Sequence, residues 1–274
     1  MPELPEVEVT RRGIAPTLTG RRITSTNWRV PALRYPLPHS SSERFVGLPL
    51  LAVHRRGKYL LLEFASGHLL IHLGMSGSLR LVRSTLAAAK HDHVDLVFGK
   101  GRGATVLRMH DPRRFGAILW IEGDVLLHPL LRVLGIEPLT DEFTASWLKR
   151  SLANVKAAIK PTLMDGHRVV GIGNIYASES LFRAGIHPAA PAGKVSLARL
   201  QRLVPEIKET LAAAISAGGS SLRDFIHSDG SSGYFQQQYF VYGRAGEPCR
   251  VCQSPIRGLR QAQRATFYCP RCQR

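Results

Sequence analysis

The sequence predicts a multidomain α+β protein with a leading helix, a β-sandwich or barrel, a helical region and a small C-terminal module. Eight short segments with strand-like patterns lie within residues 22–122. The composition becomes helix-like near residue 140, and all four cysteines fall in the last 26 residues. A chain of 274 residues is long enough for two domains and a small appendage.

The first predicted element is a helix over residues 3–19. Its apolar residues recur at helical spacing, and they are Leu4, Val7, Ile14 and Leu18. Pro5 is tolerated in a first turn, and Gly20 is a typical helix stop. Strands are predicted directly after this helix, because the chain there consists of short β-branched or alternating runs that are separated by Gly, Pro and Asp. They are RITSTNWRV, LLAVHRR, KYLLLEF, HLLIHLG, GSLRLV, HVDLVF, ATVLRMH and FGAILWIE. Eight such strands predict a sandwich or a barrel.

Three helical segments are predicted in the next part of the chain. They are TDEFTASWLKRSLANVKAAIK, NIYASESLFRAGI and SLARLQRLVPEIKETLAAAIS. The second is entered through Gly171 and Gly173, and the third contains Pro205. The Gly/Ser-rich stretch over residues 218–236 predicts a loop.

The cysteines have the spacing C-x2-C-x16-C-x2-C, formed by Cys249, Cys252, Cys269 and Cys272. Each C-x2-C turn presents two sulfurs to one side of a tetrahedron, so the pattern predicts one structural Zn²⁺. Two disulfides are the alternative, which does not suit a cytosolic chain without other cysteines. The sixteen intervening residues predict a β-hairpin whose tip is displayed outward.

The charge predicts a polyanion as partner. Lys and Arg number 37 against 20 Asp and Glu, giving a net charge of +17 and a pI near 10.5. A basic solvated surface is the plain alternative. No run of 18 apolar residues, signal peptide or lipidation motif is present in the sequence, which favours nucleic acid over a membrane and predicts a cytosolic protein.

The N-terminus is acidic within this basic chain, since MPELPEVEVT holds three glutamates and no base. Removal of Met1 would expose the secondary amine of Pro2, which condenses with an aldehyde-level carbon to give an iminium ion. A helix N-terminus disfavours the ammonium form, and Glu3 is close enough to move protons. The alternative is that proline stands at position 2 only because the initiator methionine can be removed before a proline.

A set of motifs along the whole chain resembles the bacterial formamidopyrimidine-DNA glycosylase family. They are MPELPEVEVTRRG, RRGKYLLLEF, IHLGMSGSLR, KHDHVDL, DPRRFGAILW, VVGIGNIYASESLFRAGIHP, SDGSSGYFQQQYFVYGR and QRATFYCPRC. The resemblance implies a base excision repair enzyme, a bifunctional DNA glycosylase and AP lyase that removes 8-oxoguanine and formamidopyrimidines from damaged double-stranded DNA. It also implies an N-terminal β-sandwich, a helix–two-turn–helix domain and a zinc finger.

The resemblance assigns catalytic roles to four residues. It makes Pro2 the nucleophile that attacks C1′ to form a Schiff base, and Glu3 the proton donor to the sugar ring. Lys58 assists base excision and β-elimination, and Arg264 grips phosphate at the lesion and is linked to δ-elimination. Glu6 supports the site electrostatically.

The resemblance also implies a DNA-binding set. A damaged base must be flipped out of the helix, and the residues that fill the gap are Met75, Arg113 and Phe115, with Arg113 reading the opposite C. Without the resemblance, Met75 and Phe115 would be read as core residues. The other DNA contacts are His72, His91, Asn174 and Tyr242, with Asn174 at a helix N-terminus that suits phosphate. The lesion-contacting loop is Ser220, Ser221, Leu222, Arg223, Asp224 and Phe225.

These inferences predict three domains, over residues 1–135, 136–239 and 240–274, in a monomer of the bacterial cytosol or nucleoid. Two other functions remain open. An endonuclease VIII-type glycosylase for oxidised pyrimidines shares the Pro-Glu start, although Leu4 and the DPRRFG motif favour the purine enzyme. A non-catalytic zinc-ribbon protein that binds nucleic acid explains the charge and cysteines, but not Pro2, Glu3 and Lys58 together.

Overall fold

The computed structural model describes residues 2–220 and 239–274, and its contacts divide the chain into two compact units. The first unit contains the described residues up to Arg132 and the short stretch 217–220. The second contains Val133–Ser216 and residues 239–274. The predicted loop residues 221–225 lie outside the described residues.

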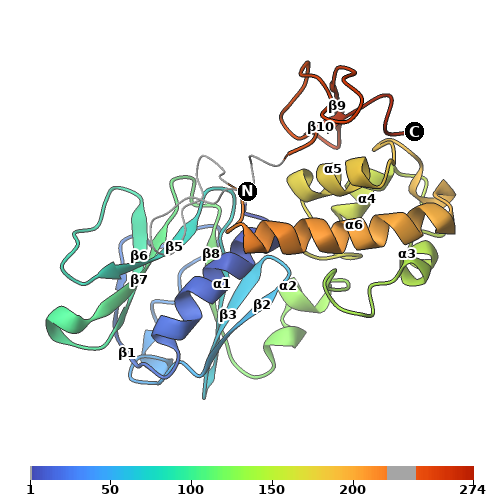
Figure 1. Ribbon diagram of the computed structural model, residues 1–274. Helices are drawn as coiled ribbons and strands as arrows, with labels where there is room; N and C mark the ends of the chain where they lie inside the picture. Colours follow the sequence, from blue (N-terminus) through green and yellow to red (C-terminus); the bar gives the residue numbers. More distant parts are fainter. Residues whose placement is uncertain (1, 221–238) are drawn as a thin grey trace. The chain divides into compact units, whose positions relative to one another are not determined.

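The first unit is built from one long helix and two antiparallel sheets (Figure 1). Helix α1 spans Leu4–Leu18. One sheet has the order β1 (Ile23–Trp28), β6 (Asp92–Phe98), β7 (Thr105–His110) and β5 (Ser78–Arg83). The other has the order β2 (Ala52–Arg56), β3 (Tyr59–Phe64), β4 (Gly67–His72) and β8 (Ala117–Ile121). All eight predicted strands are therefore present, and two separate sheets make the structure a sandwich.

A single apolar core joins both sheets and the helix. The alternation of strand side chains sends Leu60 and Leu62 of β3 inward, where they meet Leu96 and Leu107 of the other sheet in one buried cluster. Helix α1 contributes apolar side chains at helical spacing to the same cluster, and these are Val7, Ile14 and Leu18. The helix is thus held against the sandwich, which sets the position of its N-terminus.

The second unit contains four helices and a hairpin (Figure 1). The helices are α3 (Ala145–Ser151), α4 (Ile159–Leu163), α5 (Asn174–Arg183) and α6 (Leu197–Ser216), and the short α2 (Pro129–Arg132) lies in the first unit. Single 3₁₀ turns are η1 (Ser42–Arg44), η2 (Gly101–Gly103), η3 (Val125–Leu127) and η4 (Ala192–Lys194). No described helix is long and apolar enough to cross a membrane.

One predicted helix was wrong in its extent. The helix predicted over residues 140–160 starts only at Ala145, because the Thr144 hydroxyl caps α3 by accepting the Trp147 N–H at 3.1 Å. It ends at Ser151, and α4 begins at Ile159. Between the two helices, Asn154 takes a left-handed conformation with φ of 63°. Residues 174–186 and 196–216 form helices as predicted, and α6 accommodates Pro205.

The cysteine module packs against the helices of its own unit. Strands β9 (Arg257–Gln261) and β10 (Arg264–Tyr268) form the predicted antiparallel hairpin. Phe182 of α5 lies in a buried cluster with Val241 and Ile256, and its ring stacks on Phe240 at 5.1 Å between centroids. A small module gains from this cover, since few apolar side chains of its own are available.

Candidate functional site

The start of α1 places Pro2 directly before a helix N-terminus. Glu3 is the N-cap residue, and a reciprocal capping box joins it to Glu6. The carboxylate of Glu3 accepts the backbone N–H of Glu6, while the Glu6 side chain accepts the Glu3 N–H at 2.8 Å. Pro2, Glu3 and Glu6 are all buried. The ring nitrogen predicted to react is therefore held beside two carboxylates and the positive end of the helix dipole.

Glu6 also holds the chain where it enters the predicted lesion loop. Its Oε1 accepts the backbone N–H of Ser220 at 2.9 Å and the Ser220 hydroxyl at 2.8 Å. Gly219, with φ of 82°, leaves room for this contact, because a Cβ there would lie 3.3 Å from the Glu6 side chain. One buried carboxylate thus ties the N-terminus to the first loop residue. The residues predicted to follow it, Ser221 to Phe225, lie outside the described part of the chain.

Another glutamate of α1, Glu8, stabilises the helix through ion pairs. Glu8 is bound by Arg11 and Arg12 at 2.8 Å each and by Arg55 at 3.2 Å. Burial by itself raises the pKa of Glu8, but the hydrogen bonds from Arg11 and Arg12 and the charge of Arg55 lower it to about 2. Glu8 is therefore ionised in structural ion pairs and takes no direct part in acid–base chemistry.

Lys58 lies in the turn between β2 and β3, next to His72 of β4. Tyr59 pairs with His72 in the sheet, with 4.8 Å between their rings. Burial, reinforced by the charges of Lys58 and Arg34, lowers the pKa of His72 to about 4. The Nδ1 atom of His72 accepts the Gly74 N–H at 3.0 Å, so Nε2 carries the proton. His72 is thus a neutral hydrogen-bond donor at pH 7.

The predicted gap-filling residues come from two loops whose backbones touch. A Cβ on Gly74 would lie 2.4 Å from the Phe115 carbonyl carbon, so only glycine fits beside that loop. Phe115 is 45% exposed, and the Arg113 guanidinium lies 4.8 Å from its ring centroid. Met75 is half-buried in the adjoining turn. The structure therefore brings Met75, Arg113 and Phe115 together, and Phe115 is not a core residue.

A buried aspartate that the sequence interpretation missed holds both loops. Asp111 is fully buried, and its carboxylate accepts the Ser76 hydroxyl at 3.0 Å and the Gly116 N–H at 2.8 Å. Its backbone carbonyl accepts the Arg114 N–H at 3.2 Å. Charge-assisted bonds of this kind fix loop positions well. The sequence signal was present in DPRRFG, but Asp111 was read only as part of a motif.

His91 lies at the start of β6 in a group of imidazoles. Its ring is 6.2 Å from that of His93 and 5.9 Å from that of His110. His110 contacts the buried Asp92 at 2.8 Å. Asp92 also accepts the Ala89 N–H at 2.8 Å, which fixes the turn leading to His91.

In the second unit, a buried lysine joins α4, α5 and the hairpin. Lys160 is only 1% exposed, and its Nζ donates to the Asn174 side-chain oxygen at 2.6 Å. It also donates to the Thr266 hydroxyl at 2.7 Å and the Ala265 carbonyl at 3.0 Å, both on β10. Asn174 is the first residue of α5, after the N-cap Gly173. Lys160 was missed because a lysine in the apolar run AAIKPTL carries no motif of its own.

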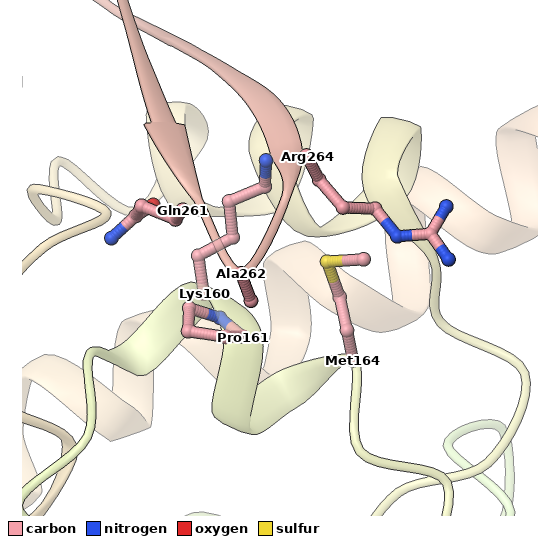
Figure 2. A pocket seen from close by; sticks show the side chains of 6 residues that line it. All are labelled: Lys160, Pro161, Met164, Gln261, Ala262 and Arg264. Carbon is pink, nitrogen blue, oxygen red and sulfur yellow. The ribbon is translucent and has the colours of Figure 1, made fainter.

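Arg264 lies at the first position of β10, beside the tip of the hairpin. It pairs with Gln261 across a two-residue turn in which Ala262 and Gln263 have φ of 44° and 60°. Such angles in residues other than glycine carry strain, which proteins tolerate chiefly at functional positions. A cavity of about 200 Å³ lies below the tip, and Figure 2 shows Arg264 and Met164 on one side of it and Lys160 on the other. Arg264 is exposed, so its guanidinium is accessible.

Tyr242 is held by another buried acid that was missed. Glu179 of α5 accepts the backbone N–H groups of Phe240 at 2.8 Å, Val241 at 3.0 Å and Tyr242 at 2.8 Å. Burial raises the pKa of Glu179, and these three donors oppose that rise. The ring of Tyr242 contacts Phe267 of β10 with 5.4 Å between centroids. Its position therefore depends on α5 and on the hairpin.

The four cysteines form a metal site. All four sulfurs lie within 4.8 Å of one another, with 3.4 Å between Cys252 and Cys269 and 3.9 Å between Cys249 and Cys272. A disulfide would require about 2.05 Å, whereas tetrahedral zinc with bonds of about 2.3 Å places sulfurs about 3.8 Å apart. Backbone N–H groups of Val251 and Cys272 point at the sulfurs, as in zinc thiolate sites. The residues fit one structural Zn²⁺.

Comparison with protein-family models matches three consecutive parts of the chain. Residues 1–118 match the formamidopyrimidine-DNA glycosylase N-terminal domain, and residues 134–226 match the H2TH domain of the same glycosylase. Residues 246–274 match a zinc finger found in FPG and IleRS. The chain belongs to the formamidopyrimidine-DNA glycosylase family.

Relatives and solved structures agree with this membership. The formamidopyrimidine-DNA glycosylase of Aromatoleum aromaticum is 60% identical over the whole of both chains. That of Methylobacillus flagellatus is 56% identical, over the whole of this chain and 96% of its own. The MutM (Fpg) crystal structure from Thermus thermophilus is 38% identical, covers 99% of this chain and 98% of its own, and has a TM-score of 0.88. A complex of Lactococcus lactis Fpg with DNA containing an abasic site is 34% identical, covers 99% of each chain and has a TM-score of 0.90.

Family membership and the cysteine geometry establish the fold and the metal. The predicted α+β fold with β-sandwich, H2TH domain and four-cysteine module is confirmed, and the module holds one structural zinc. The predicted site residues fall into two sets, one in each unit. The first set gathers around the start of α1 and the loops at Met75 and Phe115, and the second around Asn174, Arg264 and Tyr242.

Proposed function

We propose that the protein is a bifunctional DNA glycosylase and AP lyase that removes oxidised purines, such as 8-oxoguanine and formamidopyrimidines, from duplex DNA. The observation that carries the proposal is the burial of Pro2 at the positive end of α1 beside Glu3 and Glu6. Family membership supports the substrate class, since a solved Lactococcus lactis relative is in complex with DNA containing Fapy-dG.

The reaction begins at the Pro2 nitrogen once Met1 is removed. The neutral secondary amine attacks C1′, the bond from C1′ to the damaged base breaks, and the base leaves with a proton. The sugar ring opens when its oxygen is protonated, which leaves an iminium between Pro2 and C1′. That cation withdraws electrons, so a proton is lost from C2′ and the 3′ phosphate leaves by β-elimination. The α1 dipole favours the neutral amine needed for attack.

Three residues assist Pro2. Glu3 donates the proton to the ring oxygen, and its place at the N-cap keeps it adjacent to Pro2. Glu6 positions the N-terminus and the entry to the lesion loop through its bonds to Glu3 and Ser220. Lys58 assists base excision and elimination.

The remaining residues bind and open the DNA. Met75 and Phe115 enter the gap left by the flipped base, and Arg113, already stacked over Phe115, pairs with the opposite C. Arg264 and Asn174 bind phosphates, which the buried charge of Lys160 also attracts. His72, as a neutral Nε2–H donor, His91 and Tyr242 add backbone contacts. The loop from Ser220 to Phe225 reads the lesion.

The organisation of the whole protein forms part of the proposal. We assign domains to residues 1–135, 136–239 and 240–274, with a monomer as the active form and the bacterial cytosol or nucleoid as its location. The three consecutive family matches support the division, and a DNA substrate supports the location.

Borohydride trapping tests the chemistry. Reduction of the iminium should join the protein covalently to duplex DNA with 8-oxoguanine opposite C. The adduct should be lost in Pro2→Gly and in protein that retains Met1, because neither offers the proline amine. An equal adduct with the blocked terminus would overturn the assignment of Pro2. A stronger adduct on oxidised pyrimidines would instead favour the endonuclease VIII-type function.

A further inference from the structure

An arginine groove lies in the second unit, at the end of α5 opposite Asn174. The groove has a volume of about 580 Å³ and is lined by Arg183, Arg199, Arg202 and Arg274, together with Ala184, Gly185 and Cys272. Helix α5 runs from Asn174 to Arg183, so its two ends are about 14 Å apart at 1.5 Å per residue. The groove is therefore distinct from the phosphate site proposed at Asn174.

The charge of this groove is only partly neutralised by the protein. Among the described residues, Arg183, Arg202 and Arg274 form no ion pair with a side-chain carboxylate, whereas Arg199 donates to the terminal main-chain oxygen of Arg274. Glu206 is close enough for the charge of Arg183 to lower its pKa, although burial and the neighbouring Glu209 raise that pKa overall. The Nε atom of Arg183 is buried without a hydrogen-bond partner, while its guanidinium lies 5.0 Å from the Phe240 ring. Buried N–H donors in proteins normally bond to an acceptor, so an acceptor atom of a ligand would satisfy this donor.

The groove is also partly preorganised. Arg199 donates through Nη2 to the Gly185 carbonyl at 3.4 Å and to the terminal main-chain oxygen of Arg274, which holds its guanidinium in place. No described partner bonds its Nε or Nη1, so these donors remain available. An immobilised guanidinium loses less entropy when a phosphate binds.

The position of one arginine opposes the stability of its own helix. Helix α6 begins at Leu197 and has no acidic residue in its first turn, so Arg199 lies at its positive end. A cation in the first turn of a helix is unfavourable. A local arrangement that opposes stability is typical of a functional site.

We propose that the arginine groove binds the phosphate backbone of a second DNA segment while the phosphate site proposed at Asn174 holds the first. Guanidinium groups match phosphate oxygens in bidentate geometry, and an open groove suits a polymer that passes along it. A second contact would allow transfer between DNA segments during the search for damage. The inference rests on the proposed function only for its choice of DNA as the anion.

The test measures whether one protein joins two duplexes. Zinc-loaded full-length protein is mixed with donor-labelled and acceptor-labelled undamaged duplexes, and energy transfer reports bridging. The groove variant is Arg202→Gln/Arg274→Gln. Its matched control, Arg132→Gln/Arg150→Gln, removes the same charge from exposed positions outside the groove. Wild type and control should bridge equally, and the groove variant should bridge about tenfold more weakly. The slope of log bridging affinity against log salt concentration should also be smaller in the groove variant, by about 1.8.

Three outcomes would overturn the proposal. The first is no energy transfer with wild type, and the second is equal energy transfer in the two variants. The third is displacement of the acceptor duplex by polyglutamate at the same concentration of charge, which would assign the groove to an acidic polypeptide. Excision of 8-oxoguanine is measured with the same protein preparations on a separate duplex that carries the lesion. Bridging without excision would refute the proposed function alone, and excision without bridging would refute the groove alone.

Discussion

The N-termini of α1 and α5 show two opposite uses of the same element. Each is the positive end of a helix dipole, where the first backbone N–H groups have no acceptor within the helix itself. At α1 the chain supplies its own carboxylates, because Glu3 and Glu6 cap the helix reciprocally. At α5 the cap is Gly173, and a buried cation, Lys160, lies beside Asn174.

The difference decides what each terminus attracts. Around α1 the carboxylates accept the N–H groups, so the terminus does not compete for DNA phosphate and can support proton transfer beside Pro2. Around α5 no acid is present in the first turn, and Lys160 adds a positive charge. We therefore expect the reaction at the α1 terminus and phosphate binding at the α5 terminus, and the following changes test that expectation.

The largest effect is expected from the zinc site. Cys269→Ser, or removal of zinc by a chelator, should abolish DNA binding by dissolving the hairpin that carries Arg264 and the partners of Lys160, since structural zinc contributes about 10 kcal/mol or more to such modules. Circular dichroism should show that the β-rich first unit stays folded. Normal binding of lesion DNA by the zinc-free protein would contradict the role given to the module.

Glu6→Gln should impair the reaction while leaving DNA binding intact. A glutamine can accept from Glu3 or from Ser220, but its amide NH₂ then faces a donor on the other side. The loss of a charge-assisted bond costs about 1.5–3 kcal/mol, so single-turnover excision should fall about 10²-fold. Glu8→Gln is the control on the same helix. A fall in affinity without a fall in rate would remove the distinction between the two helix termini.

Lys160→Met should give the reverse pattern. The variant keeps the length of the side chain but leaves Asn174 and Thr266 without the donor that Lys160 supplies. DNA affinity should therefore fall about tenfold, and the slope of log affinity against log salt concentration should become smaller by about 0.9. The rate at saturating DNA should change little. Lys156→Met, an exposed lysine in the same unit, serves as control. An effect confined to the rate would place Lys160 in the chemistry instead.

The smallest effect concerns stability in acid. The pKa of Glu8 is about 2 in the folded protein against 4.5 in the unfolded chain, so the Glu8 ion pairs stabilise the fold above pH 4.5 and lose that effect as pH falls toward 2. The contribution is on the order of 2–3 kcal/mol. Chemical unfolding of wild type and Glu8→Gln should differ at pH 6 and converge near pH 2. A constant difference across this range would show that packing, rather than charge, is responsible.

Local patterns were sufficient to predict much of this protein. The alternation in segments such as KYLLLEF predicted the strands, and the two C-x2-C pairs predicted the metal module and its hairpin. Those features depend on neighbours within a few residues. The helix predicted over residues 140–160 was too long, because the cap at Thr144 sets a later start and the left-handed Asn154 interrupts the helical periodicity of the segment.

Residues whose roles depend on distant partners were harder to find. Asp111, Lys160 and Glu179 stand in ordinary helical or loop sequence, and each serves atoms that lie at least five residues away in the chain. The exposure of Phe115 likewise depends on the backbone of Gly74 from another loop.

Residue patterns alone were enough to predict the sandwich, the helices, the zinc ligands and the acidic start with Pro2, because periodicity, metal spacing and amine chemistry can be recognised in the linear chain. The folded structure was needed to show which carboxylate holds the N-terminus to Ser220, which lysine joins Asn174 to the hairpin, and where four arginines meet. These contacts join segments up to 214 residues apart, and their geometry arises only when packing brings those segments together.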